Sequence, residues 1–70
     1  MTDSELRHIF IEIFNGRGNH GSFLRAFAEA FILADMDNWH LLRPAARAIA
    51  GKYHLTDYLD TFQQPEAASG

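Results

Sequence analysis

The 70-residue chain contains no cysteine, which excludes disulfide bonds and zinc sites built on thiolates. It also lacks any apolar run close to the ~20 residues that a membrane-spanning helix needs, and its first residues do not resemble a secretory signal peptide. A basic excess is missing as well, since the formal net charge is −3, which argues against general nucleic-acid binding. We therefore expect a cytoplasmic protein with neither a membrane partner nor a general nucleic-acid partner.

What the chain does contain is enough apolar surface for a folded domain. Hydrophobic residues make up 47% of it, including six Phe, two Tyr and one Trp, so it is not a disordered segment. A domain this small buries only about 60% of its unfolded surface, and one such core rarely supplies more than ~3–5 kcal/mol. Without disulfides, its stability must come from very good packing or from oligomerisation.

The first helix is expected to begin after Thr2 and to end near Gly16. Thr2 and Glu5 have the spacing of a capping box, in which each side chain accepts a hydrogen bond from the other residue's backbone N–H. The β-branched residues that follow would also suit a strand, but the chain offers no second strand for pairing. The apolar residues recur at helical spacing and form one stripe: Leu6, Ile9, Phe10, Ile13 and Phe14.

The second helix, over residues 22–34, is apolar on almost every side. Its phenylalanines repeat every four residues: Phe23, Phe27 and Phe31. We expect the middle one, Phe27, to be fully buried. Only Arg25 and Glu29, spaced to pair along the helix, mark a narrow polar strip. A helix of this kind must be covered on most sides, so we expect it to be the central helix and to contact a second subunit. The alternative is a monomer whose alanines are exposed.

A third helix is expected over residues 38–53, and a short fourth helix follows it, capped by Thr56. Pro44 cannot donate a backbone hydrogen bond, so it should kink the third helix or restart it. The third helix has this apolar stripe: Trp39, Leu42, Ala46, Ile49, Ala50 and Tyr53. The fourth helix has a shorter one: Leu55, Tyr58, Leu59 and Phe62.

These elements predict an all-α fold, a small bundle of three to four short helices that is completed by oligomerisation. The single helical domain covers residues 1–62. Residues 63–70, QQPEAASG, are polar and contain helix breakers, which predicts a disordered tail.

The segment NGRGNHGSF, residues 15–23, contains the pattern G-x-G-x-x-G. It is not a dinucleotide-binding fingerprint, because that motif needs a preceding strand within a βαβ unit. Nor is it a Walker A loop, which would end in Gly-Lys-Ser or Gly-Lys-Thr. Two interpretations remain open. We favour a hinge whose glycines permit positive φ. The alternative is an anion site made by backbone N–H groups at the start of the second helix, with Arg17 and His20 nearby.

A second candidate site is a basic stripe on the outer face of the third helix. It consists of four residues: His40, Arg43, Arg47 and His54. The first three lie at i, i+3 and i+7 and therefore share one side of the helix. Guanidinium groups suit phosphate and carboxylate ligands. The alternative, which we favour, is a solvated face or a set of salt bridges between subunits that involve Asp57 and Asp60.

Nothing in the sequence selects a catalytic or metal site. The histidines show neither H-x-x-x-H nor H-E-x-x-H spacing, and with no cysteine a zinc site would have to use carboxylates. A serine nucleophile would need a base and an oxyanion hole, for which Ser22 beside His20 is too slight a basis. We expect a non-enzymatic protein with no cofactor and no metal.

Residues 23–55 carry four recognisable segments: Phe-Leu-x-Ala-Phe-Ala-x-Ala, Ala-Asp-x-x-Asn, Leu-Leu-x-Pro-Ala-Ala and Lys-Tyr. This arrangement resembles a pattern in short uncharacterised helical proteins of phages, prophages and environmental sequences. Most of the matching positions are apolar core positions, so the resemblance implies a shared fold and no particular activity. A phage context favours two roles, sequestering a host signal molecule or blocking a host protein.

We therefore expect a homo-oligomeric binding protein that captures an anionic small molecule, such as a nucleotide signal. Its ligand would bind at the basic stripe together with the loop over residues 17–20. The alternative is a helical protein-binding module or inhibitor of a host protein, with Trp39, Tyr53 and Tyr58 as anchors. A nucleotide site should be sensitive to salt and depend on the arginines, whereas a protein-binding site should present an exposed apolar patch and ignore small ligands.

Overall fold

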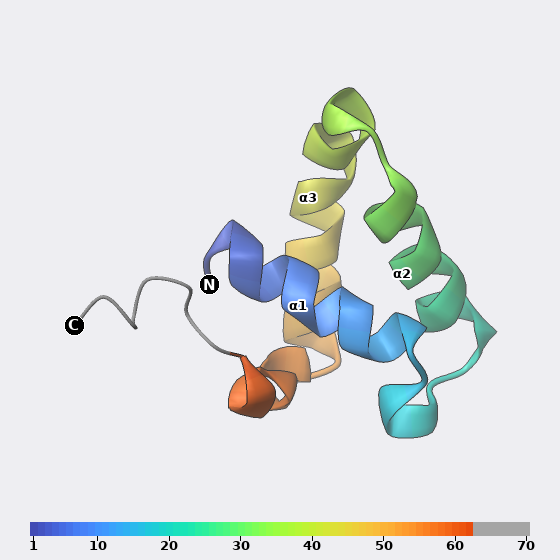
Figure 1. Cartoon of the computed structure of the whole chain (residues 1–70), viewed down its shortest axis with the longest axis vertical. Coiled ribbons are helices and arrows are strands. Elements are labelled where there is room, and N and C mark those ends of the chain that lie inside the picture. The colour runs from blue at the N-terminus through green and yellow to red at the C-terminus, as the bar shows by residue number, and fades with distance from the viewer. Residues whose placement is uncertain (63–70) are drawn as a thin grey trace.

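The computed structural model describes residues 1–62 and shows three α-helices and two short 3₁₀-helices, with no strand in this part of the chain (Figure 1). In order, the elements are α1 (Asp3–Phe14), η1 (Arg17–Asn19), α2 (Ser22–Leu33), α3 (Met36–Lys52) and η2 (Leu55–Thr61). The predicted all-α fold is confirmed. The tail predicted over residues 63–70 lies outside the described residues. None of the helices in residues 1–62 has the length and apolarity needed to cross a membrane.

The bounds of α1 agree with those predicted from the sequence, because the residues that begin and end a helix interact only with neighbours a few positions away. The Glu5 backbone N–H donates to the Thr2 hydroxyl at 3.1 Å, and the Thr2 N–H donates to the Glu5 carboxylate at 2.7 Å. This completes the predicted capping box. The hydrogen bond from the Thr2 N–H also lowers the pKa of the Glu5 carboxyl. Phe14, the last residue of the predicted stripe, stays exposed at the end of the helix.

α1 is the element around which the others pack. It lies across α3 in Figure 1, with its C-terminal end next to α2, and contacts every other element, whereas α2 contacts only α1 and α3. The expectation that residues 22–34 form the central helix is therefore corrected. The reason is the size of the buried side chains, because α1 contributes four large ones that are fully buried: Leu6, Ile9, Phe10 and Ile13.

The buried face of α2 differs from the predicted phenylalanine stripe. Its buried residues are Leu24, Ala28 and Phe31. Phe27 is only half-buried and Phe23 is 59% exposed, so the prediction of a fully buried Phe27 is wrong. The physical reason is the helical repeat. Residues four apart are rotated by about 40°, so over eight residues the phenylalanines turn by about 80°, from solvent to core.

α3 begins two residues earlier than predicted and is not interrupted at Pro44. Asp35 is its N-cap, and the Asp35 carboxylate accepts a hydrogen bond from the Asn38 N–H at 2.9 Å. The helix continues through Pro44 to Lys52, so the predicted restart does not occur. Proline removes one backbone donor here, while Ala46 and Ala50 remain fully buried against the core.

The last element, η2, is a 3₁₀-helix of seven residues. It begins after His54, which has a left-handed backbone (φ 56°), and no side chain caps it within the described residues, so Thr56 is not the cap. Leu55 is buried, and Tyr58 and Leu59 pack against the core. Tyr53, predicted as part of the buried stripe of the third helix, is exposed beside this turn.

Candidate functional site

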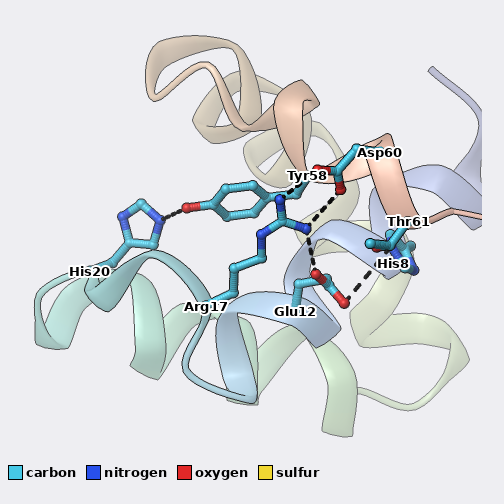
Figure 2. Close-up of polar contacts among 7 residues, drawn as sticks. All are labelled: His8, Glu12, Arg17, His20, Tyr58, Asp60 and Thr61. Carbon is cyan, nitrogen blue, oxygen red and sulfur yellow. Dashed lines mark hydrogen bonds and ion pairs between the residues drawn. The ribbon is translucent and has the colours of Figure 1, made fainter.

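Arg17, one of the predicted anion ligands, is already paired with two carboxylates of its own chain. Figure 2 shows its guanidinium between Glu12 of α1 and Asp60 of η2. It donates to Glu12 Oε1 at 2.7 Å and to both oxygens of Asp60 at 2.9 Å. The guanidinium carbon also lies 4.4 Å from the centre of the Tyr58 ring. The hydrogen bonds to Asp60 and Glu12 raise the pKa of Arg17 further above its ordinary range.

His20 is held by the same group of side chains. Its Nε2 lies 2.6 Å from the Tyr58 hydroxyl (Figure 2). On the other side of the group, His8 Nε2 lies 2.9 Å from the Thr61 hydroxyl. The glycine loop makes this arrangement possible, because Gly16 and Gly18 have φ of 100° and 82°, which only glycine adopts readily. The positive φ predicted for the loop is thus present, and Arg17 and His20 fasten the loop to η2. Its role as a hinge stays a prediction.

The basic stripe of α3 is likewise directed toward its own chain. Arg43 donates to Asp3 Oδ2 at 3.1 Å, and Arg47 donates to Asp3 Oδ1 at 2.8 Å and to the Met1 carbonyl at 2.7 Å. The guanidinium carbon of Arg43 also lies 5.2 Å from the centre of the Trp39 ring. These arginines therefore fasten α3 to the start of α1. Within the chain their carboxylate partner is Asp3, and the predicted salt bridges to Asp57 and Asp60 of another subunit stay a prediction.

The two remaining histidines of the predicted site stand apart from these groups. His40 is exposed and meets the edge of the Trp39 ring, with ring centres 5.5 Å apart. His54 is exposed at the left-handed turn before η2. The six predicted residues thus do not converge. The carboxylates that hold the two arginine groups, Asp3 and Glu12, are separated by most of the length of α1, about 13 Å.

A shallow polar hollow lies at the start of α2. It is lined by five residues: His20, Ser22, Arg25, Ala26 and Glu29. Gly21 is the N-cap and provides no side chain for capping. The hollow contains a carboxylate beside its arginine, so it has no single sign of charge. Arg25 and Glu29, predicted to pair along the helix, form no ion pair within residues 1–62.

Exposed apolar residues gather instead on the side of α2 that faces away from the core. Four of them follow one another at spacings of three, four and three: Phe23, Ala26, Ala30 and Leu33. Leu33 is 73% exposed, and Leu41 of α3 is 75% exposed. Leu33 and Leu41 line one groove of about 350 Å³ between α2 and α3, with Ala30, Ala34 and Leu42 among its other walls. We call Phe23, Ala26, Ala30, Leu33 and Leu41 the outer apolar face.

The outer apolar face was not predicted as a unit from the sequence. The signal was present, because the spacing of three, four and three is that of the seam between two packed helices. It was masked by the apolar residues on the other sides of α2, and in particular by the regular repeat of the phenylalanines. The structure thus exposes these apolar residues on one side of α2 and beside it on α3.

A scan against protein-family models and searches of curated proteins and of solved structures find no match for this chain. The resemblance to small phage proteins stays a prediction. Within residues 1–62, no three His, Asp or Glu side chains are grouped so that they could hold a metal ion.

Proposed function

We propose that this protein is a non-enzymatic binding module that recognises an apolar helix of another protein chain through its outer apolar face. The observation that supports this proposal most directly is the exposure of Leu33 and Leu41 around one groove. Large contiguous patches of exposed apolar surface are rare on monomeric soluble proteins and mark interaction sites. Two alanines, Ala26 and Ala30, lie in the middle of the face and allow the backbone of a second helix to approach closely.

Capture of an anionic nucleotide is supported less well. Arg43 and Arg47 would have to release Asp3, and Arg17 would have to release Glu12 and Asp60. Each release sacrifices charge-assisted hydrogen bonds that the protein already has. Blocking a host protein, one of the two roles that the phage-type resemblance favours, requires only a binding face. The proposal therefore rests on the protein-binding alternative.

Two-dimensional NMR of the labelled 7.9 kDa chain tests both functions in one experiment. The probes are a panel of mono-, di- and cyclic nucleotides, and a panel of short amphipathic peptides with leucine and alanine on one helical face. We expect the peptides to shift resonances of the outer apolar face and the nucleotides to leave Arg43 and Arg47 unchanged. The double variant Leu33→Ser, Leu41→Ser should lose the peptide response while remaining helical by circular dichroism.

Phe14→Ser is the matched control, because Phe14 is also apolar and exposed but lies on α1, outside the outer apolar face. It should respond to the peptides as the parent does. The proposal is wrong if the nucleotides shift the Arg43 and Arg47 resonances while no peptide in the panel shifts the outer apolar face.

A further inference from the structure

We infer that a second copy of this chain covers the outer apolar face, with the two α2 helices antiparallel across a two-fold axis. This inference rests on the proposed function, because both use the same face. α2 lies at the edge of the molecule in Figure 1, and among the described elements it contacts only α1 and α3. A two-fold axis requires that the surface be complementary to itself. Three features of α2 meet this requirement.

The first feature is the order of large and small side chains along the face. The midpoint between Phe23 and Leu33 is position 28, and the midpoint between Ala26 and Ala30 is the same. An antiparallel arrangement about this position therefore places each alanine opposite the partner's other alanine. The two small pairs let the helices approach closely, and the large residues then meet at both ends, Phe23 against the partner's Leu33.

The second feature is the groove beside Leu33. It lies at the C-terminal end of α2, where an antiparallel copy brings the start of its own α2. The partner's Phe23 is 59% exposed in a single chain and is the largest exposed apolar side chain of this helix. Ala30 and Ala34 line the groove. Phe23 lies on the same flank of the face, because residues 23, 30 and 34 are separated by about one or two whole helical turns. A two-fold axis keeps matching flanks together, so the groove is placed to receive that ring.

The third feature is charge. Arg25 and Glu29 are exposed on the opposite flank of the face and form no ion pair with each other within residues 1–62. In the antiparallel arrangement about position 28, Arg25 lies roughly 3 Å along the axis from the partner's Glu29. The arginine side chain can span that offset. The two-fold axis produces this contact twice. Arg25 and Glu29, which form no ion pair with each other in one chain, therefore pair between the two chains.

A contact between two short helices and one neighbouring leucine falls at the small end of interface sizes, below ~1,200 Å² in total, where association is weak. The oligomeric state must therefore be measured over a range of concentrations. Sedimentation equilibrium from about 10 µM to about 500 µM detects dissociation constants between micromolar and millimolar, the weak end of the affinity scale. We expect a reversible change from one mass of 7.9 kDa to twice that mass.

Charge reversal tests which surface the two copies share. Arg25→Glu and Glu29→Arg should each weaken dimerisation by about tenfold, because each replaces two attractive contacts with two repulsive ones. The double variant Arg25→Glu, Glu29→Arg restores opposite charges and should return the dissociation constant to within about threefold of the parent. Arg7→Glu controls for net charge, since Arg7 is exposed on α1 and lies outside the face.

Disulfide formation tests the direction of the helices, and the parent chain has no cysteine to interfere. Ala26→Cys and Ala30→Cys chains are prepared separately, mixed and oxidised. Antiparallel helices bring these two positions together, so the mixed disulfide should be the main product. Parallel helices would bring each position next to the same position of the second copy. They would favour the two unmixed disulfides, which join identical chains.

A monomer at every concentration overturns the inference, and so does a dimer that the two single charge reversals leave unchanged. A majority of unmixed disulfides overturns the antiparallel geometry. These failures are distinct from failure of the proposed function. A chain that stays monomeric but still binds the amphipathic peptides at its outer apolar face keeps its proposed function and loses only the second copy as partner.

Discussion

Arg17 on η1 holds Asp60 on η2 through two hydrogen bonds of 2.9 Å, although the two residues are 43 positions apart in the chain. The same guanidinium donates to Glu12 at 2.7 Å, so one side chain joins α1, η1 and η2. A guanidinium presents its donors in a rigid plane that matches a carboxylate. The Arg17–Asp60 pair therefore sets the position of η2 against the glycine loop more closely than a lysine at position 17 would.

The Arg17–Asp60 pair should make folding stability fall at acid pH. The hydrogen bonds from Arg17 lower the pKa of Asp60 in the folded chain below its ordinary value of 3.8. A carboxyl whose folded pKa is lowered contributes stability that is fully present above its unfolded pKa and is lost as pH falls through the folded pKa. The contribution should therefore decline below about pH 4.

An NMR titration of the Asp60 carboxyl carbon measures this directly. We expect its pKa to lie below 3.8 in the parent chain and to return close to 3.8 in Arg17→Met. Arg7→Met removes an exposed arginine that forms no ion pair within residues 1–62 and should leave the titration of Asp60 unchanged. An Asp60 pKa that is equal in the parent and in Arg17→Met would contradict the role given to this pair.

Gly18→Ala should destabilise the fold more than an alanine at either neighbouring glycine. A left-handed backbone costs a residue with a Cβ about 1–2 kcal/mol, and at position 18 that Cβ would also collide with the Tyr58 hydroxyl. We expect a loss of about 2 kcal/mol or more in the free energy of unfolding. That is a large part of the ~3–5 kcal/mol available to so small a core.

Two matched variants separate strain from collision. Gly16→Ala carries the same backbone strain (φ 100°), but its Cβ would meet open space, so it should cost only about 1–2 kcal/mol. Gly21 has φ −69° and open space around it, so Gly21→Ala carries neither cost and should lose only the preference of an N-cap for glycine over alanine, about 1 kcal/mol or less. Urea denaturation of the three variants gives the order, and equal losses at positions 16 and 18 would exclude a close approach of Tyr58.

Phe31→Ala and Phe23→Ala test which face of α2 is buried. Phe31 is fully buried, so its truncation should cost about 3–5 kcal/mol and leave the chain largely unfolded. Phe23 is exposed in a single chain, and its truncation should change stability by about 0.5 kcal/mol or less at concentrations where the chain is monomeric. Thermal melts followed by circular dichroism distinguish the two variants. Similar losses of stability at both sites would contradict the assignment of the buried face of α2.

Asp3→Asn should weaken the contact between α1 and α3 without unfolding the protein. The substitution removes the carboxylate charge that Arg43 and Arg47 share. Because all three side chains are partly exposed to solvent, each pair contributes only about 0.2–1 kcal/mol. We expect a loss of about 1 kcal/mol at low salt that shrinks as salt is added, since salt screens exposed charges. A loss that is independent of salt would mean that another property of Asp3 matters.

The sequence by itself determined the local features of the fold. The all-α class, the capping box at Thr2 and Glu5, and the approximate bounds of α1 and α2 depend on interactions among residues three or four positions apart. Such interactions are visible in any stretch of the chain. The same holds for the glycine loop, whose positive φ at Gly16 and Gly18 follows from residue type and from its place between two helices.

Only the tertiary structure decided which face of α2 is buried and which carboxylate each arginine meets. Because α2 has apolar residues on nearly every side, the sequence is equally compatible with several rotations of this helix about its own axis. The packing of α1 against α2 decides that Leu24, Ala28 and Phe31 form the buried face. The partners Arg17–Asp60 and Arg43–Asp3 are 43 and 40 positions apart. Their pairing depends on where whole helices cross, because charge alone does not specify a partner among several exposed carboxylates.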